Sequence, residues 1–73
     1  MVVKNSLKEL LDNRGIKQSW LAERCDIHRG TMNNIIMNKY NTSLEVALKI
    51  AKVLNMKVDD IFELIEDENN LIK

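Results

Sequence analysis

A link of only two residues, Asp26-Ile27, joins two stretches of helical apolar spacing and restricts the fold more than any other feature. The two stretches run over residues 18–25 and 28–37. Two helices joined this tightly must cross at a steep angle, as they do in a helix-turn-helix. The crossing needs a small side chain midway along the first helix, and Ala22 stands there. The sequence therefore predicts a helix-turn-helix over these residues.

The remainder of the chain also has apolar residues at helical spacing, in segments 6–13, 43–54 and 58–65. No segment alternates apolar and polar residues over enough positions to predict a strand. The expected fold class is all-α, with five short helices around one core in a single domain over residues 1–65. Residues 66–73 are expected to form an acidic, frayed tail.

Capping signals mark the ends of these helices. Ser6 with Glu9, and Thr42 with Glu45, form two capping-box patterns, which predict that Ser6 and Thr42 cap the first and fourth helices. Left-handed stops after these two helices are expected at Gly15 and Asn55.

The composition excludes several classes of protein. The longest apolar run is three residues, which is too short for a transmembrane helix or a signal-peptide core. One cysteine and one histidine allow neither an internal disulfide nor a metal cluster, so no metal and no cofactor are expected. The cysteine, Cys25, is expected to be a buried and inert thiol. These observations favour a cytoplasmic location.

Charge is distributed unevenly along a chain whose formal net charge is zero. Residues 1–57 carry ten basic and five acidic side chains, whereas residues 58–73 carry one basic and six acidic side chains. This asymmetry indicates a basic working module followed by an acidic tail, and a basic module favours a nucleic-acid partner. The alternative is that the charges of a helix-rich protein are scattered unevenly by chance.

Three segments carry a resemblance to a known family: Gln18–Ala22, Met32–Ile35 and Ser43–Ala51. At their observed separations they resemble the phage repressor/Cro family of DNA-binding domains, also called the XRE family, over about residues 6–64. The resemblance implies a compact, lambda-repressor-like domain. The second helix of its helix-turn-helix is then expected to lie in the DNA major groove.

The chain departs from the family pattern at several positions. Asp26 stands at the inter-helix turn where the family usually has glycine, and aspartate tolerates the left-handed conformation only moderately. Asn38 replaces the glycine after the recognition helix, where asparagine can still form a left-handed cap. Lys17, His28 and Lys57 stand where Ser or Thr would ordinarily cap a helix. These three changes are expected to lower the stability without altering the fold.

The resemblance also implies the site residues, by matching position. Arg29 can form a bidentate pair with guanine and Asn34 with adenine, and their alternative role is ordinary solvated surface. His28 is either a phosphate contact or a solvent-exposed cap. The implied base-contacting residues are Arg29, Gly30, Thr31, Asn33 and Asn34, and the implied phosphate-contacting residues are Gln18, His28, Lys39, Tyr40 and Asn41.

The function expected from this reading is a sequence-specific, DNA-binding transcriptional regulator, most simply a repressor. It would bind a pseudo-palindromic, double-stranded operator as a homodimer. The chain has no room for a ligand-sensing module, which suggests control by concentration or by another regulatory protein, as in phage or mobile-element regulators. The alternative is an antitoxin or antirepressor that binds another protein. No catalytic motif is present, so an enzyme is not expected.

The apolar residues of segment 58–65 exceed what one helix face needs to cover the core. This surplus predicts a dimer interface near the C-terminal end of the chain. Trp20 is unusual for the family, and it either covers a neighbouring helix or belongs to a partner interface. The residues expected in the dimer interface are Ile61, Phe62, Leu64 and Ile65.

Overall fold

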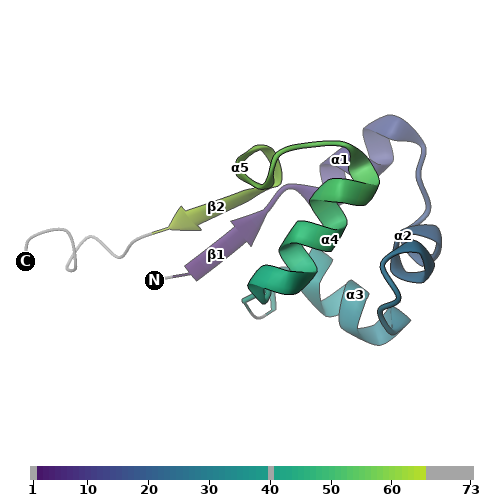
Figure 1. Ribbon diagram of the computed structural model, residues 1–73, viewed down its shortest axis with the longest axis horizontal. Coiled ribbons are helices and arrows are strands. Elements are labelled where there is room, and N and C mark those ends of the chain that lie inside the picture. The colour runs from purple at the N-terminus through teal and green to yellow at the C-terminus, as the bar shows by residue number, and fades with distance from the viewer. Residues whose placement is uncertain (1, 40, 66–73) are drawn as a thin grey trace, which may run out of the picture.

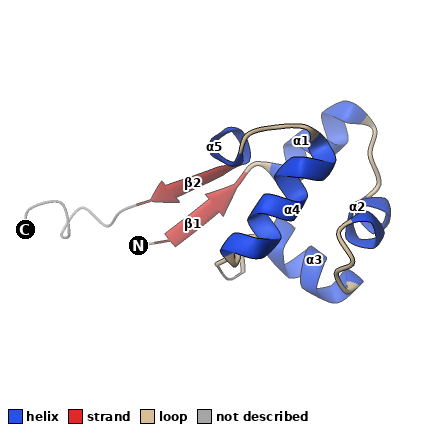
Figure 2. Cartoon of the chain, in the orientation of Figure 1, coloured by secondary structure: helices blue, strands red, loops and turns tan. Residues whose placement is uncertain are grey.

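Five helices and one short antiparallel sheet make up the part of the chain that the computed structural model describes, residues 2–39 and 41–65 (Figures 1 and 2). The expected tail over 66–73 lies outside the described residues. The prediction of five helices is confirmed, and the all-α class is corrected by the sheet. In chain order the elements are β1 (Val2–Asn5), α1 (Leu7–Arg14), α2 (Gln18–Arg24), α3 (Arg29–Ile36), α4 (Leu44–Leu54), α5 (Val58–Ile61) and β2 (Phe62–Ile65).

The core is built from the apolar stripes of all five helices, and β2 adds one aromatic side chain to it, Phe62. Each long helix contributes residues spaced three and four apart, which places them on one face. Burying one large aliphatic side chain stabilises the fold by about 1.5–3 kcal/mol. The largest completely buried side chains are Leu7, Leu21, Met32, Ile35 and Ile50.

The predicted helix over 58–65 is wrong in its second half, because α5 ends at Ile61 and the chain continues as β2. β2 pairs with β1 in an antiparallel register that sets Val3 opposite Leu64 and Asn5 opposite Phe62. The extended backbone keeps Phe62 in the core while its neighbours pair with β1. A short segment with apolar residues at this spacing fits a helix turn and a strand about equally well, and the sequence pattern could not decide between them.

The two expected N-caps have different outcomes. Ser6 is the N-cap residue of α1, as expected, but its side chain makes no capping bond; instead, the first N–H of α1 donates to Asn5 Oδ1 over 3.1 Å. At α4 the cap is Ser43 rather than Thr42, and the Ser43 hydroxyl accepts a 3.3 Å hydrogen bond from the backbone N–H three residues on. The correction at α4 replaces one good capping residue by its neighbour in the sequence.

The left-handed stops at Gly15 and Asn55 are confirmed, with φ of 66° and 56°. Asp26 and Asn38 adopt the same conformation, with φ of 56° and 59°. Asp26 therefore forms the inter-helix turn despite its Cβ, and Asn38 terminates the recognition helix as expected. Short polar side chains carry the least penalty after glycine in this region of φ.

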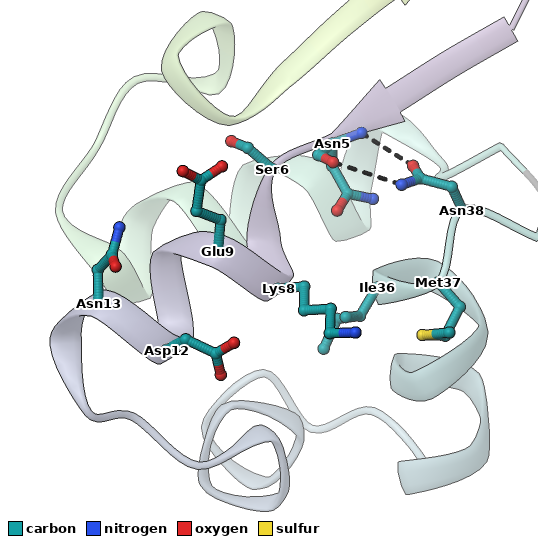
Figure 3. A pocket seen from close by; sticks show the side chains of 9 residues that line it. All are labelled: Asn5, Ser6, Lys8, Glu9, Asp12, Asn13, Ile36, Met37 and Asn38. Atoms are coloured by element: carbon teal, nitrogen blue, oxygen red, sulfur yellow. Dashed lines mark hydrogen bonds between the residues drawn. The ribbon is translucent and has the colours of Figure 1, made fainter.

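Three asparagines fasten β1 to the end of α3 and to the loop that follows it. Asn5 Nδ2 donates to the Ile35 carbonyl over 2.7 Å, and the Asn5 backbone N–H donates to Asn38 Oδ1 over 2.9 Å. Asn38 Nδ2 returns a longer bond of 3.4 Å to the Asn5 carbonyl, so the two residues face each other (Figure 3). The Val3 N–H donates to Asn41 Oδ1 over 3.0 Å. The position of β1 is therefore tied directly to the C-terminal end of α3.

No helix in the described ranges combines the length and the apolar character that crossing a membrane requires. Within the same ranges, the side chains that commonly bind metals do not gather in groups of three or more.

Candidate nucleic-acid interface

The pair α2 and α3 forms the predicted helix-turn-helix. Ala22 is 1% exposed at the crossing, where it packs with buried residues of α3, among them Met32 and Ile35. The turn is closed by two backbone bonds: Asp26 N–H donates to the carbonyl of Glu23, and the next N–H donates to the Ala22 carbonyl. Each bond satisfies a carbonyl that the end of α2 would otherwise leave unpaired. The turn therefore fixes the angle between the two helices.

α3 divides into a buried face and a solvent-facing one. Its buried residues are Met32, Ile35 and Ile36, which recur at helical spacing against the core. The residues predicted to contact bases fall on the remaining positions. Arg29, Gly30 and Asn33 are exposed, and Thr31 and Asn34 are half-buried.

Two side chains on the open face of α3 keep their full hydrogen-bonding capacity. Arg29 and Asn34 make no side-chain hydrogen bond or ion pair within the described part of the chain. Arg29 therefore presents a planar set of donors, and Asn34 presents one acceptor and two donors. Both groups can form bidentate pairs with the edge of a base.

The other polar groups at this end of α3 are held in place by neighbours. Gln18 Nε2 donates to Asn33 Oδ1 over 3.1 Å, which links the first residue of α2 to the open face of α3. His28 caps α3, since the Gly30 N–H donates to its Nδ1 over 3.1 Å, so the proton of a neutral ring lies on Nε2. A Cβ on Gly30 would lie 3.3 Å from Nδ1, a tight contact that the His28 ring would have to relieve by a small shift.

The loop after α3 carries the remaining residues that were predicted to contact phosphate. Lys39 and Asn41 are exposed, and Tyr40 lies outside the described residues. Asn41 already accepts the bond from Val3 through Oδ1, which leaves its NH₂ group to donate elsewhere. The structural role of Asn41 was missed from the sequence because its partner lies 38 positions away.

The residues predicted to form the dimer interface divide into two groups. Ile61 and Phe62 are only 3% and 8% exposed, so they belong to the core of one chain. Leu64 is 55% exposed and Ile65 is half-buried, so these two reach the surface.

Three residues outside the predicted DNA contacts also have defined environments. Cys25 is buried, and burial raises the pKa of its thiol above the ordinary value of 9.0, while Lys49 partly opposes that shift. Trp20 is an exposed residue of α2, and the Arg24 guanidinium lies 5.4 Å from the centre of its ring. Arg14 Nη1 donates to the Leu54 carbonyl over 2.9 Å, and this bond gives the last carbonyl of α4 a hydrogen-bond partner.

An open depression of about 490 Å³ lies between α1 and the end of α3 (Figure 3). Its α1 side carries Glu9 and Asp12, and also Lys8, which directly precedes Glu9 in the sequence. None of the residues predicted to contact DNA lines this depression. Those predicted residues that the structure describes lie on α3, at the starts of α2 and α3, and in the loop after α3.

Comparison with known proteins agrees with this geometry. A family model described as a Cro/C1-type HTH DNA-binding domain matches residues 6–67. An "uncharacterized HTH-type transcriptional regulator YgzD" of Bacillus subtilis is 42% identical over 67 residues, which are 92% of this chain and 100% of the relative. The similarly described MJ0272 of Methanocaldococcus jannaschii is 38% identical over 66 residues, 90% of this chain and 100% of the relative.

A solved structure has the same fold. The crystal structure of "a putative DNA-binding protein from Bacteroides fragilis" superimposes with a TM-score of 0.76 at 26% identity, covering 85% of this chain and all of that one. The helix-turn-helix, the free polar groups on α3 and the match over residues 6–67 lead to one assignment. The chain belongs to the family of Cro/C1-type helix-turn-helix DNA-binding domains.

Proposed function

We propose that the protein is a sequence-specific transcriptional regulator that represses by binding a pseudo-palindromic operator as a homodimer. The observation that carries the proposal is the open face of α3, where the side chains of Arg29 and Asn34 have no hydrogen-bond or ion-pair partner among the described residues and lie beside an apolar buried face. Such a helix can enter the major groove without losing its packing on the core.

Base recognition is assigned to the open face of α3. Arg29 donates to the O6 and N7 atoms of a guanine, and Asn34 pairs with the N6 and N7 atoms of an adenine. Asn33, held by Gln18, keeps its NH₂ group for an acceptor on a neighbouring base. Gly30 lets the helix backbone approach the groove, and Thr31 lies at the edge of the same surface.

Phosphate contacts surround this surface. Gln18 and His28 lie at the starts of α2 and α3, where His28 Nε2–H donates to a phosphate oxygen. Lys39, Tyr40 and Asn41 belong to the loop that follows α3. Contacts of this type fix the register of the protein on DNA and make its affinity depend on salt.

Repression follows from occupancy of a promoter, because a DNA-binding domain that is bound there excludes polymerase. One recognition helix reads only a few base pairs, so useful specificity needs two copies. Two-fold symmetry then sets the half-sites about 34 Å apart, one turn of the double helix.

Selection from random-sequence DNA tests the proposal. The protein should enrich one motif with two inverted halves, and footprinting should show both halves protected. Operator affinity should fall steeply with salt. Enrichment of a single half-site would contradict the homodimer, and the absence of salt-sensitive retention on any DNA would exclude the DNA-binding function.

A further inference from the structure

We propose that Asn38 is a positioning residue for DNA binding, which fastens the loop after α3 to β1 and so holds Lys39 where its ammonium contacts a phosphate. This inference rests on the proposed function for the role of Lys39. Asn38 is not itself among the residues predicted to contact DNA, so it acts through its neighbour in the sequence.

Both groups of the Asn38 amide bind the backbone of one residue of β1. Asn38 Oδ1 accepts the Asn5 N–H over 2.9 Å, and Asn38 Nδ2 donates to the Asn5 carbonyl over 3.4 Å (Figure 3). Two residues paired across an antiparallel sheet exchange the same two bonds through their backbones. The Asn38 side chain therefore takes the place of a neighbouring strand at this point of β1.

Asn5 is in turn held by two helices. Its Nδ2 donates to the Ile35 carbonyl in the last turn of α3 over 2.7 Å, and its Oδ1 accepts the Leu7 N–H at the start of α1 over 3.1 Å. The Ile35 carbonyl also accepts the Asn38 backbone N–H over 3.0 Å, so Asn5 and Asn38 share one acceptor. Asn5 is therefore a fixed point to which the loop can be attached.

The loop is attached to β1 a second time, three residues further along the chain. The Val3 N–H donates to Asn41 Oδ1 over 3.0 Å, and it points away from β2 as the Asn5 N–H does. The two residues between these attachments are Lys39 and Tyr40, both of which were predicted to contact phosphate.

Lys39 is also tied to the recognition surface. Its backbone N–H donates over 3.0 Å to the carbonyl of Asn34, which is assigned to a base. The Lys39 side chain is exposed and has no ion-pair partner among the described residues. Fixing a loop before binding lowers the conformational entropy that is lost on binding, and affinity rises accordingly.

The alternative is that Asn38 only ends α3. Its φ is 59°, a left-handed value that glycine adopts with less strain. Asn55 ends α4 in the same conformation, with φ of 56°, but its exposed side chain makes no hydrogen bond within the described part of the chain. The two asparagines share the backbone role and differ in the bonds to β1, so Asn55 supplies a matched control.

Titrations of random-sequence DNA at several salt concentrations test the proposal. Asn38→Gly should weaken binding about three- to tenfold, the effect of one hydrogen bond. The slope of log affinity against log salt should become shallower by up to about 0.9, the value of one phosphate contact. Asn55→Gly should change neither quantity. The melting temperature of Asn38→Gly should change little, because relief of strain offsets the lost bonds.

The base preference separates positioning of the loop from damage to α3. Asn38→Gly should weaken binding equally on the selected operator and on random DNA, as loss of a phosphate contact does. A distorted recognition helix would instead relax the preference for the bases assigned to Arg29 and Asn34 and would contradict the proposal.

A double variant tests whether Asn38 acts through Lys39. Lys39→Ala should weaken binding to all DNA and lower the salt slope. Adding Asn38→Gly to Lys39→Ala should cause little further loss, because the group that Asn38 positions is already absent. Losses that add in full would overturn the proposal.

Amide exchange in the free protein tests the attachment without DNA. Asn38→Gly should speed exchange of the Asn5 N–H, whereas the Lys4 N–H, which points toward β2, should keep its rate. Equal exchange of the Asn5 N–H in both proteins would mean that the attachment does not form.

Two further results would overturn the proposal: an unchanged affinity in Asn38→Gly, or an equal loss in Asn55→Gly. An unsubstituted protein that shows no salt-sensitive retention on DNA would overturn the proposed function and, with it, this role of Asn38. The two failures are distinguishable, because the failure of the function is seen without any variant.

Discussion

Gln18 and Asn33 connect the two helices of the DNA-binding motif through a 3.1 Å bond from Gln18 Nε2 to Asn33 Oδ1. The bond orients the Asn33 amide so that its NH₂ group is the part left for DNA. A side chain from the first helix therefore sets which hydrogen-bonding group the second helix presents.

This bond predicts energetic coupling between the two residues in DNA binding. Gln18→Ala and Asn33→Ala should each weaken operator binding, and the double variant should lose about 0.5–1.5 kcal/mol less than the sum, the net value of one hydrogen bond. Competition titrations of the four proteins on one operator measure the coupling. Strict additivity would mean that the bond plays no part in recognition.

Arg29→Ala should relax the preference for one base in each half-site and should cost about 1–3 kcal/mol on the preferred operator. Affinity for random DNA should fall much less. Lys52→Ala, which removes an exposed charge from the last turn of α4, is the matched control for lost charge and should leave the base preference unaltered. An equal loss of affinity for specific and for random DNA would mean that Arg29 contacts only a phosphate.

Ala22→Leu should destabilise the fold by about 1–3 kcal/mol, because three added carbons must fit where α2 crosses α3. The neighbouring Glu23→Leu adds a similar side chain at an exposed position of the same helix and should change the melting temperature little. Thermal unfolding followed by circular dichroism compares the two. Equal melting temperatures for both variants would show that the crossing has been misplaced.

Asp26→Gly should stabilise the protein, because it removes the Cβ from a residue with φ of 56°. A gain of about 1 kcal/mol would raise the melting temperature by roughly 4–8 °C in a domain of this size. Asp12→Gly in the interior of α1 is the opposite control and should cost roughly a few tenths of a kcal/mol, since glycine is a poorer helix former than aspartate. A loss of stability in Asp26→Gly would indicate that the aspartate side chain stabilises the turn.

Cys25 should make stability decline in alkaline solution. Burial raises its pKa in the folded state, so the folded chain holds the proton more tightly than the unfolded chain does. The contribution is complete below the ordinary thiol pKa of 9.0 and is lost as the pH rises through the higher folded value. Denaturant unfolding between neutral pH and pH of about 10.5 measures the decline, and Cys25→Ala should reduce it. A thiol reagent should modify the native protein only as fast as it unfolds.

The helix-turn-helix could be predicted because its signals are local. Ala22, the short link at Asp26-Ile27 and the spacing of Met32 and Ile35 all lie within a short stretch of chain. The open face of α3 follows from the same spacing, since fixing the buried positions of a helix also fixes the exposed ones. The position of Arg29 and Asn34 on the open face of α3 could therefore be predicted from the sequence.

The strands could not be predicted because each depends on a partner at the other end of the chain. Val2–Asn5 is too short to show a period, and the apolar spacing around Phe62 suits a helix as well as a strand. The acceptor role of Asn41 depends on a similarly distant partner, because its donor is the Val3 N–H of β1. At α4 two adjacent residues, Thr42 and Ser43, are both good caps, and preference alone could not choose between them.

The pairing of Val2 with Ile65 also orders the steps of folding. Bringing together residues some 60 positions apart costs on the order of 3–4 kcal/mol in chain entropy. Strands of four residues offset little of that cost, so they should pair only after packing of the helices has brought them close together. The helices should therefore form and pack first, and the sheet should assemble last and open first. Hydrogen exchange at β2 would then be faster than global unfolding. The first and last described residues are therefore held together only in a molecule whose helical body is complete.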